Sequence, residues 1–209
     1  MKTILLIGGG GHCKSCIDII ESTKNFKIIG IIDKKEKLNT SILNYPIIGT
    51  DENILDFANQ VDYFFITLGK VSQSPKRKEL FIFLEKNKLN IPTIISPSAL
   101  VSNHAVIQSG TIIMHHAIIN ANAHIGKNCI INSKALIEHD TTIDSHSHIS
   151  TGTIINGNVV VHEHCFIGSN STVNLDVTIH KNSIIASQSL VTKSLTKPGN
   201  YRGIPVDKF

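Results

Sequence analysis

Large aromatic rings are nearly absent from this chain of 209 residues. It contains no Trp, and aromatic residues make up only 5% of the sequence, although apolar residues make up 41%. A core of this composition must be filled by aliphatic side chains, and such a core favours a repetitive β architecture. The apolar share also excludes a disordered chain.

Strong charge and long apolar runs are lacking as well. The formal net charge is +4, no basic run exceeds three residues, and no aromatic residues interleave with the basic ones. This balance predicts no nucleic-acid partner. The first apolar run, Ile4–Ile7, ends in glycines, so neither a signal peptide nor a membrane span is predicted, and a cytoplasmic location is expected.

Cysteine is sparse, and its spacing does not suggest a zinc framework. Cys13 and Cys16 form one C-x-x-C pair, but the sequence has no second such pair and no His partner at metal-ligand spacing. We therefore predict packing roles for both residues and no metal site. Cys129 and Cys165 stand at a position of the repeat described next that is reserved for small residues, and packing is predicted there too.

What the chain has in abundance is a six-residue repeat. Every sixth residue from Val101 to Val191 is Val or Ile, sixteen in a row without an insertion. Two positions before each of these, from Ala99 to Ser189, the residue is small or β-branched. A period of six fits neither the roughly 3.6-residue period of an α-helix nor the alternation of an ordinary strand. It predicts a left-handed parallel β-helix of hexapeptide repeats from about Ala99 to Ser194.

Each flat side of the predicted coil is one hexad, with the Val or Ile pointing inward and the small residue near a tight corner. Three hexads complete a coil, so the repeat predicts about five to six stacked coils. The inward residues are structural, and function must come from the outward positions and the corners.

Residues 1–95 show a different pattern, in which short apolar strands alternate with helices. This order predicts a Rossmann-like α/β domain with a small parallel sheet, followed over residues 96–209 by the β-helix domain and a C-terminal tail. Strands are predicted at 2–7, 26–32, 46–48, 63–67 and 93–95, and helices at 13–23, at 51–59 with Thr50 as N-cap candidate, and at 74–87.

The glycine turn Gly8–Gly11 lies between the first strand and the first helix, which is where such a sheet binds phosphates. Cys13 stands where a dinucleotide fingerprint would need Gly or Ala, so a phosphate or nucleotide site without hydride chemistry is predicted. His12 is a candidate donor to a diphosphate, and Asp33, at the end of the second strand, is placed to meet a ribose. A tight turn without a ligand is the alternative.

Five motifs, in this order, resemble those of the bacterial NeuD/PglD-like sugar acyltransferases over essentially the whole chain. They are Gly10-Gly11-His12, Asp33, Gly69, Ile137-Glu138-His139-Asp140 and Gly203-Ile204-Pro205. The resemblance implies a homotrimer with acetyl-CoA as the acyl donor. Its best-matching branch acetylates the amino group of a UDP-4-amino-4,6-dideoxy sugar, and a related branch serves sialic-acid-like sugars.

Two positions depart from the best-matching branch. Lys34 follows Asp33 where that branch tends to have a second acid, and Lys70 follows Gly69 where it has Asn. Both positions are expected near the nucleotide sugar, so they bear on which acceptor is used rather than on acyl transfer.

The resemblance also implies a set of site residues. His139 is the candidate general base, because an imidazole with a pKa of about 6.5 suits proton removal near neutral pH, and Asp140 is placed to hold its tautomer. No Cys or Ser stands beside His139, so direct attack on acetyl-CoA is expected. Acceptor-binding candidates are Gly10, Gly11, His12, Asp33, Lys34, Gly69 and Asn132; coenzyme-binding candidates are His148, Gly157, Ser169 and Ser187.

Three other functions stay open at this point. An O-acetyltransferase for a sialic-acid-like sugar would differ in whether the N-terminal domain binds UDP. A non-catalytic β-helix would show regular outward Thr ladders, whereas here the outward positions mix His, Asn, Lys and Asp. A sugar-nucleotide oxidoreductase would need the third glycine and a Tyr-x-x-x-Lys motif, and none of Tyr45, Tyr63 and Tyr201 has a Lys four residues later.

Overall fold

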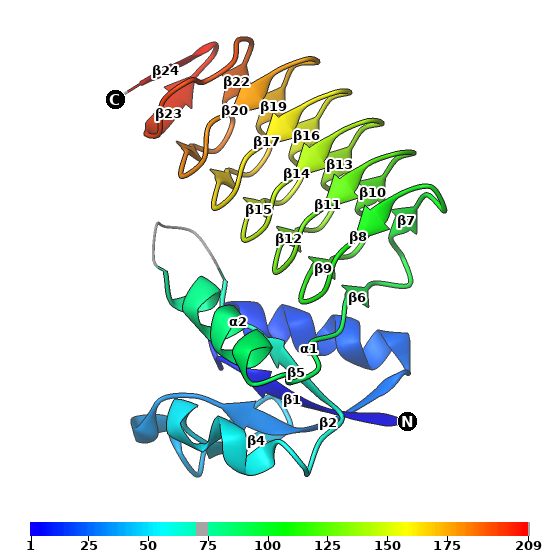
Figure 1. Ribbon diagram of the computed structural model, residues 1–209, viewed down its shortest axis with the longest axis vertical. Coiled ribbons are helices and arrows are strands. Elements are labelled where there is room, and N and C mark those ends of the chain that lie inside the picture. Colours follow the sequence, from blue (N-terminus) through cyan, green and yellow to red (C-terminus); the bar gives the residue numbers. More distant parts are fainter. Residues whose placement is uncertain (70–74, 209) are drawn as a thin grey trace. The chain divides into compact units, whose positions relative to one another are not determined.

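The computed structural model describes residues 1–69 and 75–208, which form two compact units (Figure 1). The first unit is Met1–Gly69 with Pro75–Ile94, and the second begins at Ile95. Among the described residues, no helix combines the length and apolar character needed to span a bilayer. In the same residues, no group of three His, Cys, Asp or Glu is arranged to hold a metal ion.

The first unit is an α/β domain built around one sheet. The strand order is β3-β4-β2-β1-β5. Strand β1 pairs in parallel with β2 and β5, β2 pairs in parallel with β4, and β3 is antiparallel to β4. The predicted α/β class is confirmed. The elements are β1 (Lys2–Ile7), α1 (Gly11–Thr23), β2 (Phe26–Ile32), η1 (Lys35–Lys37), β3 (Ser41–Ile42), β4 (Tyr45–Gly49), η2 (Asp51–Phe57), β5 (Tyr63–Ile66) and α2 (Lys76–Lys86).

Two predicted helices of this unit differ in detail. The helix expected at 51–59 is the 3₁₀-helix η2, which ends at Phe57. Ile54 is buried in the apolar core with Phe57 against it, and residues three apart share a face in a helix of about three residues per turn. Thr50 is its N-cap, and both its N–H and its hydroxyl donate to Asn53 Oδ1 at 3.1 Å. Helix α2 begins at Lys76; the predicted start at Ser74, like Lys70, lies outside the described residues.

The second unit is a parallel β-helix, as predicted, and Figure 1 shows its coils stacked from green to red along one axis. Its strands are two residues long and recur every six residues in three sheets. They are β6 (Ile94–Ile95), β7 (Leu100–Val101), β8 (Val106–Ile107), β9 (Ile112–Ile113), β10 (Ile118–Ile119), β11 (His124–Ile125), β12 (Ile130–Ile131), β13 (Leu136–Ile137), β14 (Thr142–Ile143), β15 (His148–Ile149), β16 (Ile154–Ile155), β17 (Val160–Val161), β18 (Phe166–Ile167), β19 (Thr172–Val173), β20 (Thr178–Ile179), β21 (Ile184–Ile185) and β22 (Leu190–Val191).

The strand predicted at 93–95 belongs to the β-helix and not to the α/β sheet. Strand β6 lies beside β9 at one end of the sheet in which β21, β18, β15, β12, β9 and β6 are neighbours in that order. Ser96 N–H donates to Ile113 O at 2.9 Å, just as Met114 N–H donates to Ile131 O in the next coil. Ile95 therefore continues the Val/Ile series one hexad earlier than predicted, because coil-to-coil hydrogen bonding has already begun there.

The two inward positions of each hexad are filled as predicted. From Ile113 onward every Val or Ile of the series is buried, whereas Val101 and Ile107, at the end of the stack, are only partly buried. The small residues add hydrogen bonds: Thr141 Oγ1 donates to Asn156 O at 2.8 Å in the next coil. Cys165 Sγ makes the same kind of contact to His180 O at 3.1 Å.

All four Cys lie within the described chain, are buried and form no disulfide. Burial raises the pKa of both Cys13 and Cys16, so these thiols are not poised for redox or metal chemistry.

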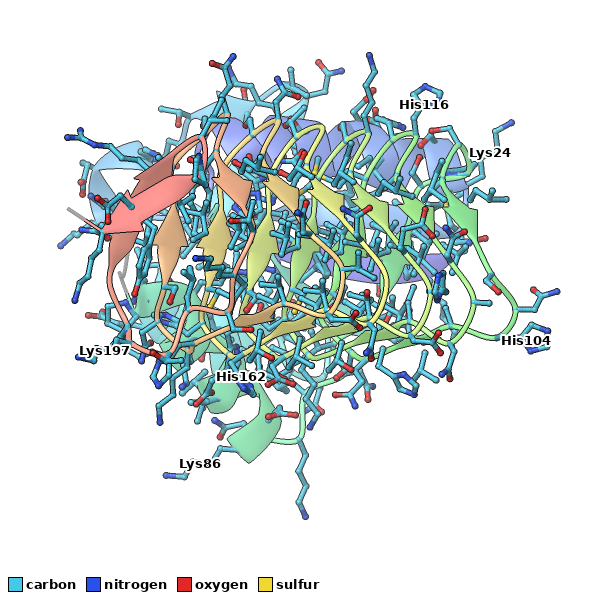
Figure 2. The ribbon with its side chains drawn as sticks, turned by 90° about the horizontal axis from the view of Figure 1, so that it is seen from above. Lys24, Lys86, His104, His116, His162 and Lys197 are labelled. Carbon is cyan, nitrogen blue, oxygen red and sulfur yellow. The ribbon has the colours of Figure 1, made fainter. Side chains whose placement is uncertain are left out.

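The corners of the β-helix are left-handed turns. Fourteen residues at six-residue intervals from Gly110 to Gln188 have a φ between 54° and 72°. Such a conformation is tolerated by Gly and, among other residues, best by Asn, Asp and His. Most of the fourteen are of these types, and this explains why the outward corners are rich in polar side chains. Figure 2 shows polar side chains projecting outward from the coils, His104 and His116 among them.

The β-helix has three corners, each made of turns that stack from one coil to the next, and these are called corners 1, 2 and 3. Corner 1 holds the turns at 114–117, 132–135, 150–153, 168–171 and 186–189. Corner 2 holds those at 120–123, 138–141, 156–159 and 174–177, and corner 3 those at 126–129, 144–147, 162–165 and 180–183. Residues 18 positions apart occupy the same place in successive coils, as Leu136 and Ile118 do.

The C-terminal segment returns to the last coil. Strand β23 (Asn200–Gly203) pairs in parallel with β21 and antiparallel with β24 (Val206–Lys208). Tyr201 is buried in the core of the β-helix, and its hydroxyl donates to Lys197 O at 2.7 Å. The edge of β21 is thereby paired rather than left open, which protects it from unwanted strand addition.

Candidate active site

His139 and Asp140 lie together at corner 2, in the turn between β13 and β14. His139 Nδ1 is 2.7 Å from Asp140 Oδ2. The side chains are 63% and 50% exposed, so the ring is open to a ligand in the single chain. Asp140 takes the left-handed position of the turn, with φ 60°. The corner therefore positions a carboxylate beside the imidazole of the preceding residue.

Gly157 makes room for this imidazole. It occupies the place of His139 one coil further on. A Cβ on Gly157 would lie 2.8 Å from His139 Cε1 and 3.0 Å from His139 Nε2. The ring thus lies against the backbone of the next coil, where any larger residue would displace it. Gly157 was expected to line the coenzyme, and its observed contact is with His139.

Two asparagines of the preceding coil bind the acids of this turn. Asn122 Nδ2 donates to Asp140 Oδ1 at 2.7 Å, and Asn120 Nδ2 donates to Glu138 Oε2 at 2.7 Å. Neither asparagine was selected from the sequence. The 18-residue spacing could have identified both, because each asparagine stands 18 residues before its partner and residues at this spacing stack in adjacent coils.

The hydrogen bonds of the turn shift two pKa values in opposite directions. The bond to Asp140 raises the pKa of His139 above its ordinary value; desolvation opposes this, and the charges of Asp140 and Glu138 add to it. The bond from Asn122, and after it the bond from His139, lowers the pKa of Asp140. Asp140 therefore stays ionised over the range in which His139 titrates.

An open pocket of about 600 Å³ lies beside His139, lined by residues 138–139, 156–158 and 174–176. These three segments contain no Ser, Thr or Cys. The lining of the pocket includes two carboxylates, Glu138 and Asp176, and one exposed apolar side chain, Leu175. The pocket can therefore offer a base and negative charge but no side-chain nucleophile of the acyl-enzyme type.

Asn132 and His148 form a second group, beside corner 1. Asn132 Nδ2 is 3.2 Å from His148 Nε2. His148 is buried, and its ring meets that of Phe166 edge to face, with the centroids 5.2 Å apart. An amide that donates to Nε2 requires that nitrogen to be unprotonated, so this contact favours the neutral imidazole.

Ser169 and Ser187 also lie at corner 1. Ser169 Oγ is 2.9 Å from Ser150 Oγ. The backbone nitrogen of Ser187 lies so close to Gly168 that no Cβ would fit there. Corner 1 thus carries Asn132, Ser169 and Ser187, whereas His139 and Gly157 are at corner 2. A single chain does not bring the two groups together.

A separate pocket of about 390 Å³ lies in the first unit, at the carboxyl ends of β1 and β2. Ligands of open parallel sheets bind at this end of the strands. Gly8, Asp33 and Lys34 line it, together with Thr50–Glu52 and Lys76. Two of the predicted acceptor-binding residues, Asp33 and Lys34, are therefore in one cavity.

Asp33 is bonded to the glycine turn itself. Its Oδ2 accepts the N–H of Gly9 at 2.9 Å and Lys37 Nζ at 2.7 Å, and its Oδ1 accepts the N–H of Lys34 at 2.8 Å. Partial burial raises the pKa of Asp33, but these hydrogen bonds lower it overall. Lys37 was missed in the sequence, although it stands at the i+4 spacing of an ion pair with Asp33, whereas Gly9 lies in the predicted glycine turn Gly8–Gly11.

The remaining predicted residues lie around the start of α1. Gly10 is the N-cap of that helix and has no side-chain cap, and Gly11 is its first residue. A Cβ added to either would meet no atom within 4 Å. Packing among the described residues therefore does not require these two glycines. The Cβ position of Gly69 is 3.4 Å from His12 Cβ, so this pair is in contact.

Comparison with known proteins gives matches in both units. Residues 3–82 match the family model of the PglD N-terminal domain, and residues 158–193 match that of the bacterial transferase hexapeptide repeats. UDP-N-acetylbacillosamine N-acetyltransferase of Bacillus subtilis is 32% identical over 115 residues. That match covers 54% of this chain and 52% of the relative, so about half of the relative's length is spanned.

In both units the chain is therefore similar to the NeuD/PglD-like acetyltransferases. Among solved structures of similar proteins, PerB of Caulobacter crescentus, in complex with CoA and GDP-perosamine, has a TM-score of 0.93 and 26% identity. The match covers 100% of this chain and 98% of that one. The acetyltransferase domain of PglB from Neisseria gonorrhoeae, in complex with acetyl coenzyme A, shares the fold, with a TM-score of 0.93, 22% identity, and coverage of 100% of this chain and 99% of that one.

The hydrogen bond between His139 and Asp140 predicts a measurable change in pKa. In Asp140→Asn the ring loses its anionic partner, so the pKa of His139 should fall toward its ordinary value. An NMR titration of the imidazole Cε1–H signal measures this. The variant His162→Ala, which removes a histidine at corner 3, serves as a control because one imidazole signal other than that of His139 disappears. An unchanged His139 pKa in Asp140→Asn would contradict the observed pairing.

Proposed function

We propose that this chain is an acetyl-CoA-dependent N-acetyltransferase that acts on the 4-amino group of a UDP-4-amino-4,6-dideoxy sugar. One observation carries the proposal: a His139–Asp140 pair faces an open, nucleophile-free pocket on a β-helix. The full-length likeness to PerB, whose structure contains CoA and GDP-perosamine, supports the same reaction class.

His139 acts as the general base in this proposal. The free amine nitrogen of the acceptor attacks the thioester carbonyl carbon, the carbon–sulfur bond breaks, and the proton that His139 takes up passes to the departing sulfur, so CoA leaves as the thiol. Asp140 holds Nδ1, so Nε2 is the nitrogen that takes the proton from the attacking amine. Because the pocket lining has no Ser, Thr or Cys, the acetyl group passes directly to the acceptor.

The charge of the pocket favours an amino sugar over a sialic-acid-like acceptor. Glu138, Asp140 and Asp176 bring three carboxylates to corner 2, and the residues lining this pocket include no Lys or Arg. A protonated amino sugar is attracted to them and releases one proton to solvent before its free amine attacks, whereas the carboxylate of a sialic-acid-like sugar is repelled. This observation supports N-acetylation and counts against the O-acetylating alternative.

The pocket of the first unit is the proposed nucleotide site. It lies where parallel sheets bind nucleotides, and the uncapped start of α1 leaves backbone N–H groups for a diphosphate. Lys34, Lys35 and Lys76 add positive charge, although Lys76 Nζ is 2.6 Å from Asp51 Oδ2. UDP is the proposed nucleotide, by analogy with the substrate in the name of the Bacillus relative.

Self-association into a homotrimer is proposed through one apolar face of the β-helix. The face formed by β7, β10, β13, β16, β19 and β22 lies between corners 1 and 2. Its outward column, here called the apolar face, is Leu100, Ile118, Leu136, Ile154, Thr172 and Leu190. Leu100 is 64% exposed and Ile154 38%. The adjacent face carries Val106, His124, Thr142, Val160 and Thr178, which is a more polar set.

Burial of the apolar face against other copies would also complete the site. Water-exposed aliphatic columns of this kind mark interfaces. Copies related by a three-fold axis would place corner 1 of one chain, with Asn132 and Ser169, next to corner 2 of another, with His139. The two groups that one chain keeps apart would then line one cleft.

Replacement of the base tests the reaction directly. His139→Ala should lower kcat for acetyl transfer by roughly a hundredfold or more, with the fold unchanged, because the attacking amine loses its proton acceptor. His162→Ala is the matched control: His162 Nδ1 is 3.0 Å from Asp144 Oδ2, a similar pair at corner 3. Turnover is measured as thiol release from acetyl-CoA with UDP-4-amino and sialic-acid-like acceptors. Near-normal turnover by His139→Ala would reject the assignment.

Nucleotide binding tests the first unit. Gly10→Ala should leave the unfolding temperature unchanged, because the new Cβ meets no atom of residues 1–69 and 75–208 within 4 Å, yet weaken UDP binding by roughly tenfold by keeping a diphosphate off the backbone. Isothermal titration with UDP, and with GDP for comparison, measures both proteins. No heat with millimolar UDP would reject a UDP-linked acceptor, and a preference for GDP would reassign the nucleotide.

A charge on the apolar face tests self-association. Ile154→Glu should reduce the sedimenting mass from three chains to one, because three carboxylates would be brought together at the interface. Val106→Glu on the adjacent face, where Val106 is 48% exposed, should leave the assembly intact. A single-chain mass for the unmodified protein, or an intact trimer of Ile154→Glu, would overturn this part of the proposal.

A further inference from the structure

Asn122 and Asp140 occupy equivalent places in adjacent coils of corner 2. Both take the left-handed position of their turns, with φ of 59° and 60°. The backbone N–H of Asp140 donates to Ala121 O at 3.2 Å, which holds the two turns in register. The Cα atoms of Asn122 and Asp140 are therefore neighbours, at the spacing of adjacent strands, which is about 4.8 Å.

The carboxylate of Asp140 is held at both oxygens. Asn122 Nδ2 donates to Oδ1 at 2.7 Å, and His139 Nδ1 is 2.7 Å from Oδ2. A carboxylate bonded through one oxygen can rotate about its Cβ–Cγ bond, whereas one bonded through both has a fixed plane. The amide of Asn122 thus decides which oxygen faces the ring and in which orientation.

We propose that Asn122 is a positioning residue that fixes the Asp140 carboxylate and, through it, the tautomer and orientation of His139. This inference rests on the proposed role of His139 as the base. Asn122 does not need to touch the substrate. It acts through Asp140, as outer hydrogen-bond partners act on the ligands and bases that they orient.

The same chain contains a comparable pair without a histidine. Asn158 Nδ2 donates to Asp176 Oδ1 at 2.7 Å, again from one coil to the next at corner 2. The residue before Asp176 is Leu175, whereas the residue before Asp140 is His139. The Asn–Asp contact is therefore a structural unit of this corner, and a test must separate its effect on the ring from its effect on the coil.

The charged and titratable groups around His139 are few. Asp140 and Glu138 lie in its own turn, Asn120 bonds Glu138 from the preceding coil, and Asp176 lies two coils further on in the same pocket. Of the groups that act on the pKa of His139, only Asp140 both accepts its hydrogen bond and depends on Asn122 for its orientation. Removal of the Asn122 side chain should therefore change the pKa of His139 through its effect on Asp140.

The variant Asn122→Gly tests the proposal without straining the turn, because Gly adopts a positive φ freely. The NMR-titrated pKa of His139 should fall, the acidic limb of the kcat/KM profile should move to lower pH, and kcat should drop on the order of tenfold with KM unchanged. Asn122→Asp, which places a second carboxylate against Asp140, should lower kcat at least as far.

Asn182→Gly is the matched control. Asn182 has the same φ of 59° at corner 3, and its Oδ1 is 3.0 Å from His164 Nδ1 one coil away. It should lose a comparable contact and leave the His139 titration and kcat unchanged. If Asn182→Gly changed both as Asn122→Gly does, the effect would be general to the coil and the proposal would fail.

The NMR titration distinguishes failure of this inference from failure of the proposed function. An unchanged His139 pKa in Asn122→Gly overturns the positioning role, whatever the activity does. A lowered His139 pKa supports the positioning role; if turnover then stayed normal in both Asn122→Gly and His139→Ala, the proposed base and not the positioning contact would be wrong.

Discussion

Hydrogen bonding between successive coils is the constraint on which the second unit depends. Each coil donates backbone N–H groups to the carbonyls of the next, as Ile118 does to Ala135 O at 2.9 Å and Asn120 does to Ile137 O at 2.9 Å. This ladder fixes residues 18 apart at the same place in neighbouring coils. Side chains therefore form columns along the β-helix, and every contact of the candidate site is a relation within or between such columns.

The residue types that suit the corners of the β-helix are also the types that the candidate site needs. Asn, Asp and His are frequent at the corners because they tolerate a left-handed backbone. They are also the residues that bind protons and donate hydrogen bonds. The turn that needs Asp140 for its φ thus obtains a carboxylate for His139, and the next coil needs a glycine at 157 so that the ring fits. A substitution at such a corner affects folding and chemistry together.

The two units contribute different parts of the proposed reaction. The first offers a cavity at the carboxyl ends of its strands, with Asp33 already engaged in holding the glycine turn. Asp33 is hydrogen-bonded to Gly9, Lys34 and Lys37, and in the proposed function the backbone of α1 and the lysines around the cavity would meet the nucleotide. The second unit offers a base and an acidic pocket, which suit an amine acceptor. In the proposed reaction, acceptor choice would depend on nucleotide binding in the first unit and on charge in the second.

The β-helix, its register and the position of His139 and Asp140 at a corner can all be predicted from the sequence. A strict period of six repeated from Val101 to Val191 has one structural solution, and adjacent residues of one turn remain neighbours in any fold. The α/β class followed from the alternation of elements, but the strand at 93–95 was misplaced. Its membership of a sheet depends on the backbone partner of Ser96, which local pattern does not specify.

The surroundings of these residues, in contrast, depend on how the coils and strands pack in three dimensions. The contacts of Asp140 with Asn122, of His139 with Gly157 and of Asp33 with Gly9 join residues 18 to 24 positions apart, and their geometry depends on side-chain direction as well as on register. The structure likewise placed Asn132 and His139 on different corners of the same chain. A one-dimensional period identifies which residues share a column, and the three-dimensional turn decides which way each side chain points.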